Sequence, residues 1–266
     1  MTTIHTTVTP HWARLASMIV LAVPALLPEA AHADERRFTF LRTATTHAKG
    51  TVEFEHWTTV KWDRPGDSYD GYWRLDFREE IEVGLTDHFQ LAFYVADWRV
   101  KHTDDTGTKT EFRNSALELK WNLTDPTTDL VGIGAYLEGK FGDEKLAAEG
   151  KLLVQKNIDQ LQLLYNLTLE GEWEDENYTE AKGKIKNQFG ASWQLTENLF
   201  AGAELLVDTT LPRWRTSDAT TGIYLGPAVA WHGKGWFIAG TLEFLVNRGS
   251  YDGDGMMFRT IVGIDF

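Results

Sequence analysis

Cysteine is absent from this 266-residue sequence, so disulfide bonds and thiol chemistry are both excluded. Long apolar runs are absent too. After residue 33 no stretch of about 18 consecutive apolar residues occurs, which excludes a transmembrane helix there. Cations are scarce relative to acids, with 26 Lys and Arg against 39 Asp and Glu. The net charge of −13 disfavours nucleic acid as a partner, because its phosphates would be repelled.

The first 33 residues have the composition of a secretory signal peptide. Arg14 precedes the apolar run LASMIVLAVPALL, and the small-residue motif AHA follows and ends at Ala33. A basic start, a short apolar region and an A-x-A site are the three parts of such a peptide. We therefore expect export and cleavage after Ala33.

The rest of the chain alternates between apolar and polar residues with a period of two. In SALELKWNL, Leu117, Leu119 and Trp121 share one face, while Glu118 and Lys120 share the other. Such alternation predicts β-strands with two different environments. Twelve segments follow the pattern: 51–62, 72–85, 89–100, 111–123, 130–141, 145–157, 160–173, 182–195, 199–209, 221–232, 236–247 and 257–266.

The alternation fits less well at 51–62 and at 89–100 than elsewhere. His56 and Glu79 fall on the apolar face of their segments. A β-bulge adds one residue to a strand and shifts the alternation. The sequence therefore predicts a bulge or a displaced strand boundary near these residues.

The connections alternate between short and long. TDH, NID and TEN are short, whereas DRPGDSYDG, KHTDDTGTKT (101–110) and EDENYTEA are longer, and GDE is short where a long loop is due. Tight turns on one rim and longer loops on the other are typical of an up-and-down meander. The predicted fold class is all-β, a transmembrane up-and-down antiparallel β-barrel of about 12 strands.

Strand length indicates a membrane rather than a soluble barrel. Soluble strands average about five or six residues, whereas a tilted strand that crosses a bilayer needs about 9 to 11. Twelve apolar faces would overfill a barrel interior, so we expect them to contact outer-membrane lipid while the charged faces line the lumen. Backbone groups in lipid must pair within the protein. We therefore expect the last strand, RTIVGIDF, to close the barrel at Phe266.

The expected organisation has three parts: a signal peptide at 1–33, an N-terminal segment at 34–50 and the barrel at 51–266. Two places are open to the N-terminal segment, the lumen as a small plug and the periplasm. The sequence does not decide between them.

Inward-facing charges are the candidate functional residues. Fourteen acids and nine bases are expected on the inner face, and three successive strands carry Glu-x-Lys pairs that would form a ladder of charge. The excess of acids predicts a preference for cations. The alternative is that these charges pair and fill the lumen. The candidates are Glu118, Lys120, Glu138, Lys140, Glu149, Lys151, Glu170, Glu204 and Arg259.

The whole mature chain resembles Gram-negative outer-membrane β-barrels. More narrowly, KGTVEFEHWTT, EIEVGLTDHFQLAFY and EGKLLVQK resemble uncharacterised transporter-like barrels grouped near the meta-pathway phenol-degradation outer-membrane proteins. The resemblance implies insertion by the barrel-assembly machinery into the outer membrane and passage of small molecules, without naming one.

Catalytic and metal-binding motifs are missing. No G-x-S-x-G occurs, and none of His56, His88, His102 and His232 has a convincing Ser partner for acyl transfer. DGDG at 252–255 lacks the remaining ligand spacing of a calcium loop. We therefore expect no enzyme, metal or cofactor. The predicted function is a channel or transporter for small solutes, and the alternatives are a lipid-acting enzyme and a structural or surface-interaction barrel with a closed lumen.

Overall fold

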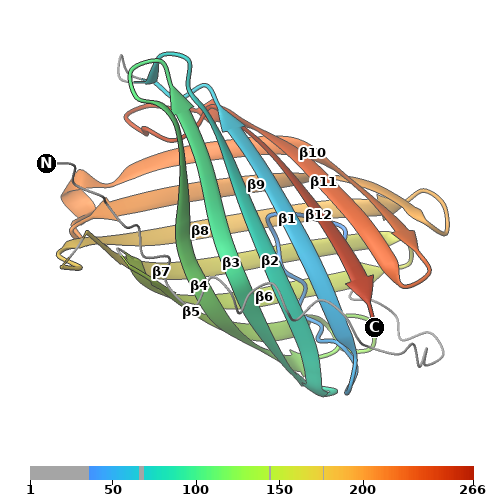
Figure 1. Ribbon diagram of the computed structural model, residues 1–266. Helices are drawn as coiled ribbons and strands as arrows, with labels where there is room; N and C mark the ends of the chain where they lie inside the picture. Colours follow the sequence, from blue (N-terminus) through green and yellow to red (C-terminus); the bar gives the residue numbers. More distant parts are fainter. Residues whose placement is uncertain (1–35, 66–68, 144, 176) are drawn as a thin grey trace, which may run out of the picture.

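The structure is a computed structural model that describes residues 36–65, 69–143, 145–175 and 177–266. The expected signal peptide and its cleavage site at Ala33 lie outside these residues. The described chain forms a closed barrel of twelve antiparallel strands (Figure 1), as predicted, with one 3-10 turn, η3 (Thr216–Asp218). The strands are β1 (Val52–Trp62), β2 (Trp73–Thr86), β3 (Phe89–Thr103), β4 (Gly107–Thr124), β5 (Gly132–Gly142), β6 (Lys145–Ile158), β7 (Leu161–Glu174), β8 (Glu180–Gln194), β9 (Leu199–Pro212), β10 (Thr220–Gly233), β11 (Trp236–Asn247) and β12 (Met256–Asp265).

The barrel closes where β12 pairs with β1. This seam is in register from Glu53 opposite Asp265 to Trp62 opposite Met256. The backbone N–H of Phe266 adds one more bond, 2.8 Å long, to the C=O of Val52. Pairing of the first and last strands satisfies backbone groups that lipid could not, and it leaves no open sheet edge.

One connection differs from its prediction. The sequence suggests a long loop at 101–110, whereas β3 runs to Thr103 and β4 begins at Gly107. The two strands remain paired in this extension, where Lys101 lies opposite Lys109. Both faces of the extension are mostly polar, so its composition is that of a loop although the backbone ladder continues.

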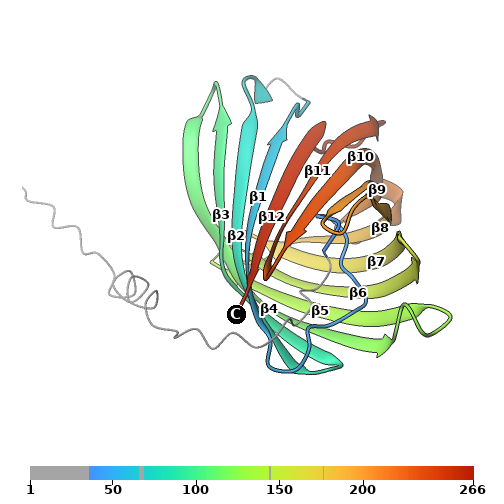
Figure 2. The same cartoon turned by 90° about the vertical axis from the view of Figure 1, so that its right-hand side faces the viewer.

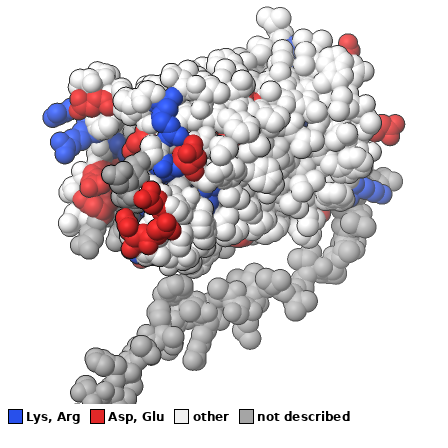
Figure 3. Space-filling view, turned by 90° about the horizontal axis from the view of Figure 1, so that it is seen from above, with Lys and Arg blue, Asp and Glu red and all other residues white. Residues whose placement is uncertain are grey.

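The outward face of the wall is apolar. Figure 3 shows a broad band without charged side chains along the barrel, while charges gather at the end that carries the long loops. Leu137, Leu169 and Val229 are 63%, 56% and 52% exposed, which suits contact with lipid. Exposed tryptophans lie close to the short turns, as an interfacial girdle requires: Trp121, Trp193, Trp231 and Trp236. No helix among the described residues is long and apolar enough to cross a membrane.

The irregularity that the sequence suggested near His56 and Glu79 has a different cause. The two residues lie opposite each other in an uninterrupted β1–β2 register, and their side chains pair on the outward face at 3.2 Å. A register shift does occur in β3, within the other poorly fitting segment, 89–100, where Val95 has no partner in β2. The alternation fails because an ion pair stands on the apolar face.

The N-terminal segment, described from Arg36 to Gly50, lies inside the barrel. Figure 2, a view onto the end with the short turns, shows its blue trace within the ring of strands. Its buried side chains include Phe38, Leu41 and Ala44, which are 1%, 2% and 0% exposed.

The two ends of this segment contact the same rim. Arg37 donates to the C=O of Gln160 beside one short turn, at 3.4 Å, and Thr46 donates to the C=O of Asp87 in another, at 3.0 Å. The segment therefore enters the lumen from the short-turn end and returns to that end before β1.

Candidate functional site

Two arginines connect the N-terminal segment to the carboxylates of the wall. Arg36 Nε lies 2.7 Å from Glu55, and the Arg42 guanidinium lies 2.9 Å from Glu80, 2.9 Å from Glu82 and 3.0 Å from Glu118. These carboxylates come from three strands, β1, β2 and β4. Guanidinium groups present several donors in a fixed plane, which suits a site with more than one carboxylate.

The neighbouring carboxylates stabilise the positive charge of Arg42. Burial alone lowers its pKa, but Glu118 and Glu80 outweigh that effect and raise the pKa well above its usual value. The backbone at Arg42 is also paired, because its N–H donates to Asn166 at 2.7 Å and its C=O accepts from the same amide at 3.0 Å. The segment is thus fixed by both side chain and backbone.

Apolar contacts and small residues complete this docking. Phe38 and Leu41 pack against Leu164. A Cβ added at Gly190 would lie 2.9 Å from Phe38, and one at Gly84 would lie 2.1 Å from the C=O of Ala48. These two inward-facing positions are occupied by glycine because the N-terminal segment approaches the wall too closely there for a side chain.

The opposite end of the lumen is covered by the β11–β12 loop. Tyr251 donates to Asp208 at 2.8 Å, and Tyr72 donates to Asp254 at 2.7 Å. Burial raises the pKa of Tyr72, Arg74 opposes the shift and Asp254 adds to it, so that the pKa is raised to about 12. These phenols therefore stay neutral and keep donating at physiological pH.

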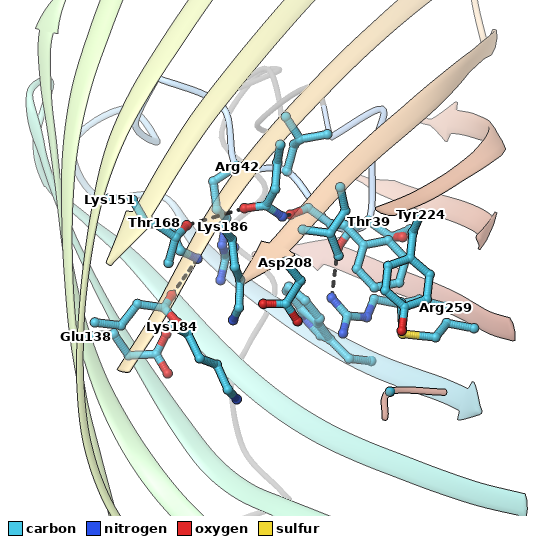
Figure 4. A pocket seen from close by; sticks show the side chains of 18 of the residues that line it. Thr39, Arg42, Glu138, Lys151, Thr168, Lys184, Lys186, Asp208, Tyr224 and Arg259 are labelled. Atoms are coloured by element: carbon cyan, nitrogen blue, oxygen red, sulfur yellow. Dashed lines mark hydrogen bonds and ion pairs between the residues drawn. The ribbon is translucent and has the colours of Figure 1, made fainter. Parts of the chain in front are cut away.

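Between segment and loop lies a chamber, formed by two cavities of about 270 and 220 Å³ that share several lining residues. Figure 4 shows Lys186, Asp208 and Arg259 directed into it, with Thr39 and Arg42 of the segment close by. Its charged lining holds eleven cations: Arg42, Lys61, Arg74, Arg78, Arg99, Lys140, Lys145, Lys151, Lys184, Lys186 and Arg259. It holds eight acids: Asp76, Asp97, Glu138, Glu149, Glu170, Glu172, Asp208 and Asp254.

One wall of the lumen carries a row of glutamates. Glu118 lies opposite Glu138, Glu138 opposite Glu149, and Glu149 opposite Glu170. Like charges directly opposite each other destabilise a sheet. Lys140 offsets this repulsion, because its Nζ lies 3.6, 3.3 and 2.8 Å from Glu138, Glu149 and Glu170.

The lysines of the predicted ladder do not form a matching row. Lys120 lies opposite Tyr136, and Lys140 lies opposite Ala147. Neighbouring strands run in opposite directions, so a lysine two residues after its glutamate points toward the short turns on β4 and toward the long loops on β5. Only the glutamates therefore align.

Arg259 differs from the other chamber cations. Its guanidinium donates to the hydroxyl of Thr59 at 2.9 Å and to the C=O of Thr39 at 3.2 Å, and it lies 4.1 Å from the ring of Phe40. Among the described residues no carboxylate lies within ion-pair distance of it. Neutral groups hold this cation, so its charge remains available to a ligand in the chamber.

The structure places all nine candidate lumen residues on the inward face. Seven contact the chamber or its glutamate row, whereas Glu204 accepts the backbone N–H groups of Thr39 and Phe40, each at 2.9 Å. Lys120 is buried nearer the short turns.

Sequence reasoning missed several cations. Arg99 and Lys145 line the chamber, and Arg36 and Arg42 lie in a segment without alternation. The pattern gave no signal for Arg99 because the bulge in β3 shifts the faces. Lys145 is in phase with Glu149 and Lys151 in segment 145–157, so the alternation itself places it on the inner face and could have identified it.

Comparisons with known proteins agree on the fold. The COG4313 outer membrane channel from Pseudomonas putida F1 superposes with a TM-score of 0.60 at 9% identity, covering 84% of this chain and 98% of that chain. The NanC porin superposes with a TM-score of 0.51 at 7% identity, covering 81% and 98%. The translocator domain of the autotransporter NalP from Neisseria meningitidis gives 0.50 at 13% identity, covering 83% and 90%.

The fold is therefore that of outer-membrane β-barrels. The narrower resemblance to phenol-degradation proteins stays a prediction. No curated protein matches the sequence. Residues 30–262 match one protein-family model, described as a family of unknown function (DUF6662).

Proposed function

Because the chain belongs to DUF6662, a family of unknown function, we propose its role from the geometry of the lumen. We propose an outer-membrane channel for small anionic solutes, closed in this conformation by the N-terminal segment. The observation that carries the proposal is the chamber, which is polar, lies inside the barrel, and holds more cations than acids.

The likeness to barrels named as channel and porin supports a transport role. So does the position of the chamber, between a segment that covers it on the short-turn side and a loop that covers it on the long-loop side. A solute that crosses the barrel would pass through this space once either cover moves.

The proposed preference for anions is the opposite of the preference for cations that the sequence predicts. The acid excess predicted cation preference, but it was counted over the whole inner wall. Much of that excess, in Glu55, Glu80, Glu82 and Glu118, contacts the arginines of the N-terminal segment. What remains around the chamber has a positive balance, and a positive lining favours anions.

A reversal potential under a salt gradient tests the proposal. The mature protein and a variant without residues 36–50 are compared in planar bilayers. We expect low conductance with the segment, higher conductance without it, and anion selectivity in both. The triple substitution Lys184→Gln, Lys186→Gln and Arg259→Gln should weaken that selectivity, more strongly at 0.01 M salt, where the Debye length is about 30 Å, than at 0.1 M, where it is about 10 Å.

Lys156→Gln is the matched control, because Lys156 lies outside the chamber and donates to the C=O of Asp129. It removes one positive charge, as each of the three chamber substitutions does, without changing the chamber. Cation selectivity in the segment-free barrel would contradict the proposed preference and restore the one predicted from the sequence.

A closed structural barrel is the second candidate, and the buried N-terminal segment favours it. Absence of conductance at any voltage after deletion of residues 36–50 would support it. A lipid-acting enzyme has less support. His56 and His102 hydrogen-bond to Thr58 and Thr108, and neither contact has the arrangement of a nucleophilic serine.

A further inference from the structure

A second cluster of charged residues lies at the barrel seam, away from the chamber. Asp265 of β12, Glu53 of β1 and Glu82 of β2 stand side by side in register on the inner face. His47 of the N-terminal segment faces them: its Nε2 lies 3.0 Å from Glu82 Oε2 and 3.7 Å from Glu53 Oε1. His47, Glu53 and Glu82 are each 1% exposed or less.

This cluster has too little positive charge. The arginines of the segment contact Glu82, Glu55, Glu80 and Glu118. None of these arginines, in the described part of the segment, lies within ion-pair distance of Glu53 or Asp265. Within the same residues, neither carboxylate oxygen of Glu53 has a hydrogen-bond partner, and all four oxygens of Glu53 and Asp265 are buried. Isolated buried carboxylates cost several kcal/mol or more, so either a cation or a bound proton must neutralise them.

We propose that a divalent transition-metal cation, with Zn²⁺ as its representative, binds His47, Glu53 and Glu82, with Asp265 as a further ligand. One ligand atom of each of the first three residues lies within 4.8 Å of the others, so a single ion can contact all three. Zinc takes imidazole nitrogen and carboxylate oxygen at about 2.0–2.2 Å. The histidine favours such an ion over Ca²⁺ or Mg²⁺, which prefer oxygen ligands alone.

The neighbouring residues fit a metal centre. Gln90 accepts the backbone N–H of His47 at 3.0 Å, and its amide donates to Glu82. Such outer hydrogen bonds orient the ligands of metal sites. The nearby triad of Glu55, Glu80 and Glu82 is a weaker candidate, because it contains no histidine and an arginine contacts each of its members.

The proposed ion would join the N-terminal segment to the seam. His47 comes from the segment, and the carboxylates come from β1, β2 and β12. Metal binding would therefore stabilise the docked segment and the closing strand pair together. This site goes beyond the proposed channel function and does not depend on whether the barrel conducts.

Calorimetric titration of the full mature protein in detergent, after EDTA treatment and dialysis, tests the site with Zn²⁺. We expect one ion per chain and at least about 10–100-fold weaker binding for His47→Gln and for Asp265→Asn, as loss of metal-site partners typically causes. His88→Gln is the matched control, since His88 lies exposed in a short turn, and it should bind Zn²⁺ as the wild type does. Ca²⁺ should compete poorly.

Zinc-edge X-ray absorption of the wild-type protein provides a measurement that needs no variant. One imidazole nitrogen together with carboxylate oxygens is the expected ligand set. Equal zinc affinity of wild type and His47→Gln would overturn the proposal, and so would a ligand set without imidazole. Absence of zinc binding, with an infrared carboxylic-acid band that Asp265→Asn removes, would show that protons neutralise the cluster instead.

Discussion

Replacement of Arg42 by Met should release the N-terminal segment from the lumen. Arg42 contacts Glu80, Glu82 and Glu118 at 2.9–3.0 Å, and no other described cation of the segment reaches Glu118. Removing one partner of a buried ion pair costs about 3–5 kcal/mol, because the remaining charges stay buried. At about 1.4 kcal/mol per factor of ten, the undocked population should rise roughly 140- to 3,700-fold.

Two assays report this release. Trypsin cleavage after Arg37 reports access to the segment, since Arg37 and Phe38 are 7% and 1% exposed when it is docked. Single-channel recording reports whether the lumen opens. We expect faster cleavage and longer openings for Arg42→Met, and a smaller effect for Arg42→Lys, which keeps the charge but not the planar donor set.

Arg113→Met provides the control for loss of an arginine ion pair elsewhere. Arg113 pairs with Glu111 and Glu174 near the long loops, partly exposed and away from the segment. Its loss should change neither assay. The reasoning is refuted if Arg42→Met leaves Arg37 as protected as in the wild type, or if Arg113→Met releases the segment equally well.

Two further predictions concern the wall. Deletion of Phe266 removes a seam hydrogen bond to Val52 and should reduce the heat-modifiable folded band on gels, both after refolding in vitro and after expression in cells. Phe266→Leu keeps the backbone bond and should assemble normally. Equal band intensity for the deletion would argue against a closing role. Glu79→Leu removes the partner of His56 Nδ1 on the outward face and should destabilise the barrel by about 1–3 kcal/mol. The double change with His56→Leu should restore stability in a denaturant titration, and a double variant less stable than the single one would contradict this.

The alternation of residues determined the barrel. Segments such as 145–157 and 236–247 match β6 and β11 to within a residue, because side chains in a strand must alternate between lipid and lumen. The same local rule identified inward charges such as Glu138 and Arg259. Where it failed, at His56 and Glu79, an outward ion pair breaks the pattern while the register between β1 and β2 remains regular.

Tertiary structure decided what these charges contact. Alternation assigns a face to each residue but no height along the barrel axis, because height depends on the stagger between strands. That stagger aligns Glu118 with Glu138, and it gathers His47, Glu53 and Asp265 from both ends of the chain. The place of residues 36–50 was equally undetermined by sequence. A segment without periodicity is positioned only by the residues that the closed barrel brings together around it. Once the arginines of this segment pair with the glutamates of the wall, the remaining charges around the chamber are mostly positive, although the inner wall as a whole carries an excess of acids.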